Sequence, residues 1–168
     1  AILLMATQRR FLRNQPGINF FKLLGTGKGE TFTPRDANSK RWGILVTIDK
    51  SKINNFDNSP VIKAWRKIAT SEYSATLQPI SSHGFWSKQQ PFTPNIQNWN
   101  GKVVAITRAR IKWLQNFKFW QAVPPVTKSL HASPGLISAI GIGEAPIGLQ
   151  GTFSVWNDGA ALREFAYL

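Results

Sequence analysis

One pattern of helix, sharp turn and strand occurs twice in this chain and constrains its fold more than any other feature. Pro16-Gly17 follows a helical pattern and precedes an apolar run typical of a strand, and Pro134-Gly135 does the same. In both copies a further glycine, Gly25 or Gly143, stands nine residues after the proline. Because Pro and Gly end helices, each copy predicts a helix, an abrupt stop and a strand.

The rest of the chain can be divided by the spacing of its apolar residues and by its turn signals. Strict alternation over 42–49 predicts a strand, and Asp158 is placed to cap the last helix. Prolines at 124 and 125 predict that a helix ends before them and a second one restarts there. The predicted helices cover 2–14, 60–69, 114–122, 124–133 and 158–168, and the predicted strands cover 18–24, 42–49, 70–80, 102–113, 135–143 and 149–157.

This order of elements predicts an α+β fold built from two ferredoxin-like β-α-β-β-α repeats. The first repeat covers residues 1–80 and lacks its first strand, and the second covers 102–168, with 81–101 as a linker loop. Two such repeats pair their sheets into an α/β-barrel-type fold. A chain of 168 residues is expected to form one domain, residues 1–168.

Charge is distributed unevenly along a strongly basic chain of net charge +13. Residues 1–118 hold 19 bases and five acids, whereas 119–168 hold two bases and three acids. The imbalance favours an anionic partner, such as an acidic protein, an anionic membrane surface or the carboxylates of a cofactor; a merely solubilising surface is the alternative. Nucleic acid is disfavoured because no nucleic-acid-binding motif accompanies the charge.

Several classes of protein are excluded by what the sequence lacks. The chain has no Cys, so disulfides, thiolate metal sites and cysteine-ligated haem are ruled out. No apolar run approaches the roughly 18 residues of a membrane span. The opening AILLMATQRR places apolar residues before charges, the reverse of a secretory signal. A cytoplasmic protein is expected, with peripheral membrane association left open, and the absence of an initial Met suggests a fragment.

The predicted strand 102–113 carries the clearest binding signal. Arg108 and Arg110 fall on the same face, about 7 Å apart. Two guanidiniums at this spacing can each hold a carboxylate or phosphate through paired hydrogen bonds. The alternative is an exposed strand edge protected from aggregation by its charges.

Five further residues are candidates for a binding or metal site, and each also has a simpler, purely structural explanation. Trp120 belongs to an aromatic group that can roof a flat apolar ligand or form core. Arg35 and Glu144 lie just beyond strand ends, where sites often form, although solvated loops explain them equally. His83 and His131 are the only histidines, and a structural or solvated role explains both.

Several strings of residues, in order, resemble the spheroidene monooxygenase family of acyclic-carotenoid ketolases over about residues 5–167. They include INFFKLLGTGKGETFTPR, TSEYSATLQPISSHGFWSKQQPF, VAITRARI and, most specifically, GIGEAPIGLQGTFSVW followed by REFAY. The resemblance implies b-type haem as the cofactor, dioxygen as a reactant, insertion of a keto group into the end of a carotenoid, and a dimeric α/β-barrel fold. It implies an oligomer and an apolar small-molecule substrate.

In such a haem site Arg108 and Arg110 are the cations for the propionates and the aromatic residues form the slot. The family pattern places a His after the FAY segment, whereas this chain stops at Leu168. His83 and His131 are then the remaining metal-ligand candidates, with Tyr73, Tyr167 and Met5 as poorer substitutes. The chain is therefore either a truncated haem protein or a member without haem chemistry.

Two functions remain open at this point, and no catalytic residue is assigned for either. The first is a haem-dependent, monooxygenase-like protein that oxygenates an acyclic carotenoid or a similar apolar substrate. The alternative is a non-catalytic binding or scaffold protein that uses its basic face against an acidic assembly or a membrane surface.

Overall fold

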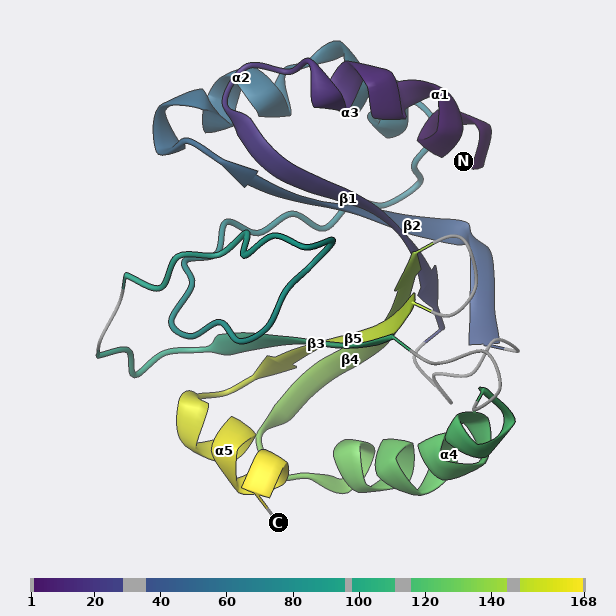
Figure 1. Ribbon diagram of the computed structural model, residues 1–168, viewed down its shortest axis with the longest axis vertical. Helices are drawn as coiled ribbons and strands as arrows, with labels where there is room; N and C mark the ends of the chain where they lie inside the picture. Colours follow the sequence, from purple (N-terminus) through teal and green to yellow (C-terminus); the bar gives the residue numbers. More distant parts are fainter. Residues whose placement is uncertain (1, 29–35, 96–97, 111–115, 145–148, 168) are drawn as a thin grey trace. The chain divides into compact units, whose positions relative to one another are not determined.

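The computed structural model describes residues 2–28, 36–95, 98–110, 116–144 and 149–167 and has the predicted α+β architecture (Figure 1). Its helices are α1 (Ile2–Arg13), α2 (Ile53–Asp57), α3 (Pro60–Arg66), α4 (Asn116–Ala132) and α5 (Gly159–Tyr167), with a 3₁₀ turn, η2, at Lys50–Lys52. Its strands are β1 (Ile18–Gly27), β2 (Ala37–Ile48), β3 (Val103–Arg110), β4 (Leu136–Glu144) and β5 (Leu149–Trp156).

The strands form one sheet in the order β2-β1-β4-β5-β3. The β1–β4, β4–β5 and β5–β3 pairs are antiparallel. No helix in the described part of the chain is long and apolar enough to cross a membrane.

The chain divides into two compact units. Unit 1 consists of Ala1–Leu23 and Ile44–Gln97, and unit 2 of Leu24–Gly43 and Asn98–Leu168. The ferredoxin-like duplication, its boundaries at 80 and 102 and the dimeric barrel stay predictions.

Unit 1 is held together by packing on α1 and α3. The residues Gln8 and Leu12, one helical turn apart on α1, are both buried, and so is Trp65 on α3. The Trp65 indole N–H donates to Oε1 of Gln8, so the only polar group of the Trp65 side chain is paired with the amide oxygen of Gln8. The segment after α3 supplies Trp86, only 4% exposed, whose ring meets Phe20 of β1 edge-on at 5.6 Å.

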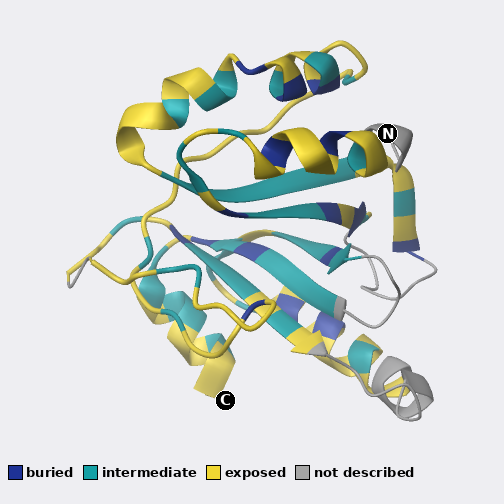
Figure 2. Cartoon of the chain, turned by 45° about the horizontal axis from the view of Figure 1, so that its top comes forward, coloured by how far each residue is buried: buried dark blue, intermediate teal, exposed yellow. Residues whose placement is uncertain are grey.

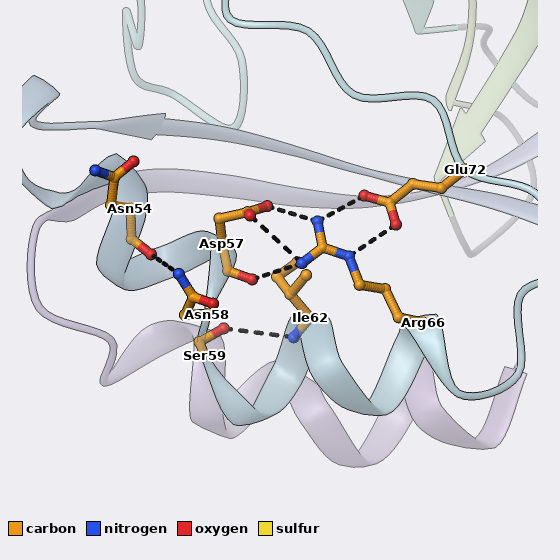
Figure 3. A network of polar contacts seen from close by, with 7 residues as sticks. All are labelled: Asn54, Asp57, Asn58, Ser59, Ile62, Arg66 and Glu72. Atoms are coloured by element: carbon orange, nitrogen blue, oxygen red, sulfur yellow. Dashed lines mark hydrogen bonds and ion pairs between the residues drawn. The ribbon is translucent and has the colours of Figure 1, made fainter.

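An exposed network of polar contacts ties α2, α3 and the segment after α3 together (Figure 3). Arg66 Nη2 lies 2.7 Å from Oδ1 of Asp57 and 2.7 Å from Oε1 of Glu72, and Arg66 Nε donates to Oε2 of Glu72 at 2.8 Å. One guanidinium therefore bridges two carboxylates that are far apart in the sequence. Ser59 caps α3, since its Oγ accepts from the Ile62 N–H at 3.4 Å.

In unit 2 one face of the β4–β5–β3 sheet packs against α4 and α5. Val103, Leu130 and Trp156 form a buried cluster, and Phe165 of α5 lies 5.4 Å from the fully buried Trp156 ring. The predicted cap of α5 is present, because Oδ1 of Asp158 accepts from the backbone N–H of residues 160 and 161 at 2.9 and 2.8 Å. Figure 2 shows the outer sides of the helices exposed and most of the strands half-buried.

The two Pro-Gly turns adopt the same local structure. Gly17 and Gly135 have φ angles of 83° and 81°, in the left-handed region that favours glycine. The carbonyl of Gly17 accepts from Asp49 N–H at 3.1 Å, and that of Gly135 from Asn157 N–H at 2.8 Å, and each donor residue directly follows the second strand after the turn, β2 or β5. The later glycines of the pattern, Gly25 and Gly143, are direct partners in the β1–β4 register.

Two expected elements are wrong. Residues 70–80 form neither a helix nor a strand, and Tyr73, Leu77 and Ile80 are exposed, so this alternating stretch has no sheet face to bury. The expected break at 124 and 125 is also absent, because α4 runs through both prolines as one helix. There the Thr127 hydroxyl donates to the Val123 carbonyl at 3.0 Å, the bond to residue i−4 that Thr side chains make inside helices.

Candidate functional site

Arg108, which the sequence singled out on β3, lies on a row of directly paired residues that crosses three strands. Arg108 of β3 stands directly opposite Gly151 of β5, and Gly151 stands opposite Ile142 of β4. Direct partners in antiparallel strands point their side chains to the same face. This face is opposite to the one that packs against α4 and α5, since Val103 and Trp156 of that core alternate with the row.

Two of the predicted site residues, Arg108 and Glu144, form an ion pair across the sheet. Nη2 of Arg108 lies 3.2 Å from Oε1 of Glu144, and the two side chains are 21% and 13% exposed. The pair joins β3 to β4 over the middle strand, so the Arg108 side chain must cross β5. Its positive charge is balanced locally, and a ligand anion would have to compete with Glu144 for it.

Because Gly151 has no side chain, the Arg108 side chain has room to cross β5. A Cβ at Gly151 would lie 3.4 Å from Cγ of Arg108 and 3.4 Å from Cγ1 of Ile142, which places those two side chains on either side of the glycine. The same Cβ would lie 2.3 Å from the Thr107 carbonyl oxygen, closer than real Cβ atoms come. Gly151 is therefore required by the close approach of β3.

The ion pair stands at one end of an otherwise apolar face. Period-two alternation puts Ile106 of β3, Phe153 of β5 and Ile140 of β4 on the row next to Arg108, because these three are direct partners. All three are half-buried, and Ile142 is 6% exposed. A surface of this kind attracts an apolar ligand through burial of hydrocarbon, and the ion pair marks its polar end.

The remaining candidates of the basic strand and its surroundings are placed only in part. Arg110 is the last residue of β3 and stands opposite Leu149, on the same face as Arg108 by register, but its side chain lies outside the described part of the structure. The same holds for the side chain of Trp120 within α4, and Arg35 lies outside the described residues altogether.

The two histidines do not converge on this face. His83 is exposed in the segment after α3, in unit 1, and its Nε2 lies 3.0 Å from Oγ of Ser81. His131 is exposed near the end of α4, in unit 2. Tyr73 and Tyr167 are 76% and 86% exposed.

This placement does not fit the ligand set that a haem requires. An axial ligand has to project from a rigid element into an apolar slot, and both histidines project from exposed positions. Within the described ranges no group of three His, Asp or Glu side chains is arranged to hold a metal ion. No step of chemistry is therefore derived through a haem.

Sequence reasoning missed one feature of the candidate site and one feature of unit 1. The first is Thr26 of β1, a buried threonine opposite Ile142 in the β1–β4 register. The second, in unit 1, is Lys22, whose Nζ lies 5.5 Å from the Phe20 ring centroid and 5.9 Å from that of Trp86 and donates to Oγ of Ser87 at 2.5 Å. Alternation along 18–27 was the available signal, because it places residues 20, 22, 24 and 26 on one face.

Comparison with known proteins gives a consistent result. The chain is 38% identical to a spheroidene monooxygenase of Rhodobacter capsulatus, over 96% of this chain and 69% of the relative. It is 32% identical to a spheroidene monooxygenase of Cereibacter sphaeroides, over 90% of this chain and 47% of that protein. It is also 32% identical to one of Rubrivivax gelatinosus, over 90% of this chain and 60% of that protein. No family model matches.

Among solved structures, a proposed monooxygenase from Lactobacillus acidophilus NCFM aligns with 98% of this chain and 70% of its own, at 16% identity and a TM-score of 0.39. That score is too low for the likeness to bear on the fold. The three sequence relatives, by contrast, share one description, that of a monooxygenase. The chain belongs to the spheroidene monooxygenase family.

Proposed function

We propose that this protein takes part in the oxygenation of an acyclic carotenoid, with the polyene lying along the apolar face of β4, β5 and β3. The observation that carries the proposal is the 38% identity to a spheroidene monooxygenase across 96% of the chain. The chain spans 47% to 69% of the length of these relatives, so the activity of a whole relative is a proposal for it. A monooxygenase places one atom of dioxygen in its substrate and reduces the other to water with two electrons from an external donor.

In this proposal the described residues have a binding role. Ile106, Phe153 and Ile140 offer a continuous strip of hydrocarbon across three strands, and burying one such side chain against a ligand contributes about 1.5–3 kcal/mol. The Arg108–Glu144 pair closes the strip with a polar group of zero net charge. A long apolar molecule can therefore lie on the strip while one end reaches a polar environment.

The proposed cofactor, a haem, rests on the family resemblance alone. Arg108 and Arg110 remain the proposed cations for its carboxylates. Glu144 already forms an ion pair with Arg108, so a haem carboxylate would have to displace it.

The first test is a binding titration of the purified chain with spheroidene, followed by quenching of tryptophan fluorescence. Saturable quenching is expected, and Ile140→Asn should weaken it about tenfold or more because a polar amide replaces hydrocarbon in the strip. The matched control is Ile137→Asn in the same strand, where the side chain is 46% exposed. Equal loss in both variants, or no saturable binding by the wild type, would refute the proposed site.

The second test measures the reaction. The protein is incubated with spheroidene, an electron donor and ¹⁸O-labelled dioxygen, and the product is analysed by mass spectrometry. One labelled oxygen in the carotenoid is expected. Saturable binding without any labelled product in the presence of haem and donor would show a binding protein rather than an oxygenase.

A further inference from the structure

A buried hydroxyl on this face has no hydrogen-bond partner among the residues that the structure describes. Thr26 is 8% exposed, and its Oγ1 is completely buried without a hydrogen-bond partner. Leaving a buried hydroxyl unsatisfied costs about 1–3 kcal/mol, so native proteins rarely retain one without a reason. Of the described side chains only Thr47 shares this property, and it lies in unit 1.

The register places this hydroxyl at the polar end of the apolar face. Thr26 is the direct partner of Ile142, which is in turn the partner of Gly151, and Arg108 completes the row. Its diagonal neighbour on β4 is Glu144, about 7–8 Å away by ordinary sheet geometry. Thr26, Glu144 and Arg108 all belong to unit 2, so their relative placement is that of one compact unit.

The charges around Thr26, those of Arg108 and Glu144, determine which kind of ligand atom can bind beside it. The charges of Arg108 and Glu144 cancel within the ion pair, and a ligand anion would face the Glu144 carboxylate. A neutral oxygen, by contrast, can accept the free O–H of Thr26 with no charge to bury. Because the surrounding side chains are hydrocarbon, the rest of such a ligand must be apolar.

We propose that Thr26, beside the Arg108–Glu144 pair, is the recognition site for a neutral oxygen atom (ether, hydroxyl or keto) at one end of a long apolar ligand. Oγ1 has no exposed surface in the free protein, so the side chains that cover it move aside when the ligand binds, and Thr26 Oγ1 then donates its hydrogen bond to the ligand oxygen. This inference rests on the proposed function, because it names which end of an acyclic carotenoid is bound and by what. An internal water is the competing occupant.

The test compares two ligands that differ in this oxygen. Spheroidene carries a methoxy oxygen near one end, whereas lycopene is an acyclic carotenoid without oxygen, and both are titrated against the full chain. A single neutral hydrogen bond should make the wild type bind spheroidene about three- to tenfold more tightly than lycopene. Thr26→Val, which removes only the hydroxyl, should abolish this preference while leaving lycopene binding unchanged.

Two further variants make the result specific. Thr26→Ser keeps a hydroxyl and should retain the preference, and Thr47→Val removes the other unpartnered buried hydroxyl and should leave both affinities unchanged. Thr26→Val should unfold at the same temperature as the wild type or higher, because a buried unsatisfied group is lost. A markedly lower unfolding temperature would show that the hydroxyl has a partner in the protein and would overturn the inference.

The outcomes separate this inference from the proposed function. Equal binding of both carotenoids by the wild type, or a preference that survives in Thr26→Val, overturns oxygen recognition and points to water, while carotenoid binding itself stands. Binding of neither carotenoid overturns both.

Discussion

A missing side chain, that of Gly151, is what allows Arg108 to reach Glu144 across the middle strand of the sheet. We expect Gly151→Ala to destabilise the protein by about 1–3 kcal/mol, because its Cβ would press on the Thr107 carbonyl at 2.3 Å and crowd Arg108. Gly43→Ala is the matched control, since a Cβ there meets nothing within 4 Å, and should be neutral or slightly stabilising. Urea unfolding of both variants measures the difference, and equal midpoints would contradict the packing at Gly151.

Removing the carboxylate of the ion pair should expose the charge that it balances. Glu144→Gln keeps the shape of the side chain but leaves the largely buried Arg108 without its counter-charge, at an expected cost of about 1–3 kcal/mol. The same variant should bind inorganic phosphate more tightly than the wild type, because no carboxylate then competes for Arg108. Thermal unfolding and a phosphate titration check the two effects, with Glu164→Gln on exposed α5 as the control. Unchanged phosphate affinity would remove Arg108 from the proposed anion site.

At the scale of elements, local patterns predicted most of the helices and strands. Alternation over 42–49 and the Pro-Gly turns after α1 and α4 depend only on nearby residues, and the structure confirms them. Residues 70–80 alternate as well but have no neighbouring strand, and strand pairing is a non-local property that the sequence does not display.

The sequence predicted which residues belong to the candidate site but not which of them are in contact. Arg108 could be chosen from the sequence because it shares one strand face with Arg110, and Glu144 because it stands just beyond the end of a strand pattern. Their contact could not, since it depends on the register of β3 with β5 and of β5 with β4 together. Thr26 escaped notice for the same reason, because burial and the lack of a partner are properties of the assembled sheet.

The Arg66 network makes a prediction about pH at the junction of α2, α3 and the following segment. The hydrogen bonds from Arg66 lower the pKa of the Glu72 carboxyl below its ordinary value of 4.5. A carboxyl with a lowered pKa in the folded state stabilises the protein above its unfolded-state pKa, and this contribution disappears as the pH falls through the folded-state value.

We therefore expect Glu72→Gln to lower the unfolding temperature modestly at pH 7, and this deficit to shrink as the pH falls below about 4.5 toward the lowered pKa of the folded-state carboxyl. Thermal unfolding of both proteins between pH 7 and pH 3 provides the measurement, with Glu164→Gln treated in parallel. A deficit that stays constant over this range would show that Glu72 acts through packing rather than charge.

For the whole molecule, the two compact units share the positive charge almost evenly although the two parts of the sequence do not. Unit 1 contains ten bases and three acids, and unit 2 contains eleven bases and five acids, giving net charges of +7 and +6. The balance arises because residues 24–43 belong to the same unit as the C-terminal part of the chain. A basic surface is thus a property of both units, and charge alone does not single out one of them as the site of an anionic partner.

The placement of the histidines in different units leads to the last prediction. His83 in unit 1 and His131 in unit 2 are both exposed, and the His83 ring is engaged with Ser81. Neither is held by an apolar slot that would exclude water from a bound iron, so neither should act as an axial ligand. We expect His83→Ala, His131→Ala and the double variant to leave the haem titration of the chain unchanged when absorbance is followed near the Soret maximum. A stoichiometric Soret band in the wild type that disappears in one of the single variants would identify that histidine as the ligand. It would also require the segment carrying it to take another position around the iron, since both histidines are exposed in the structure.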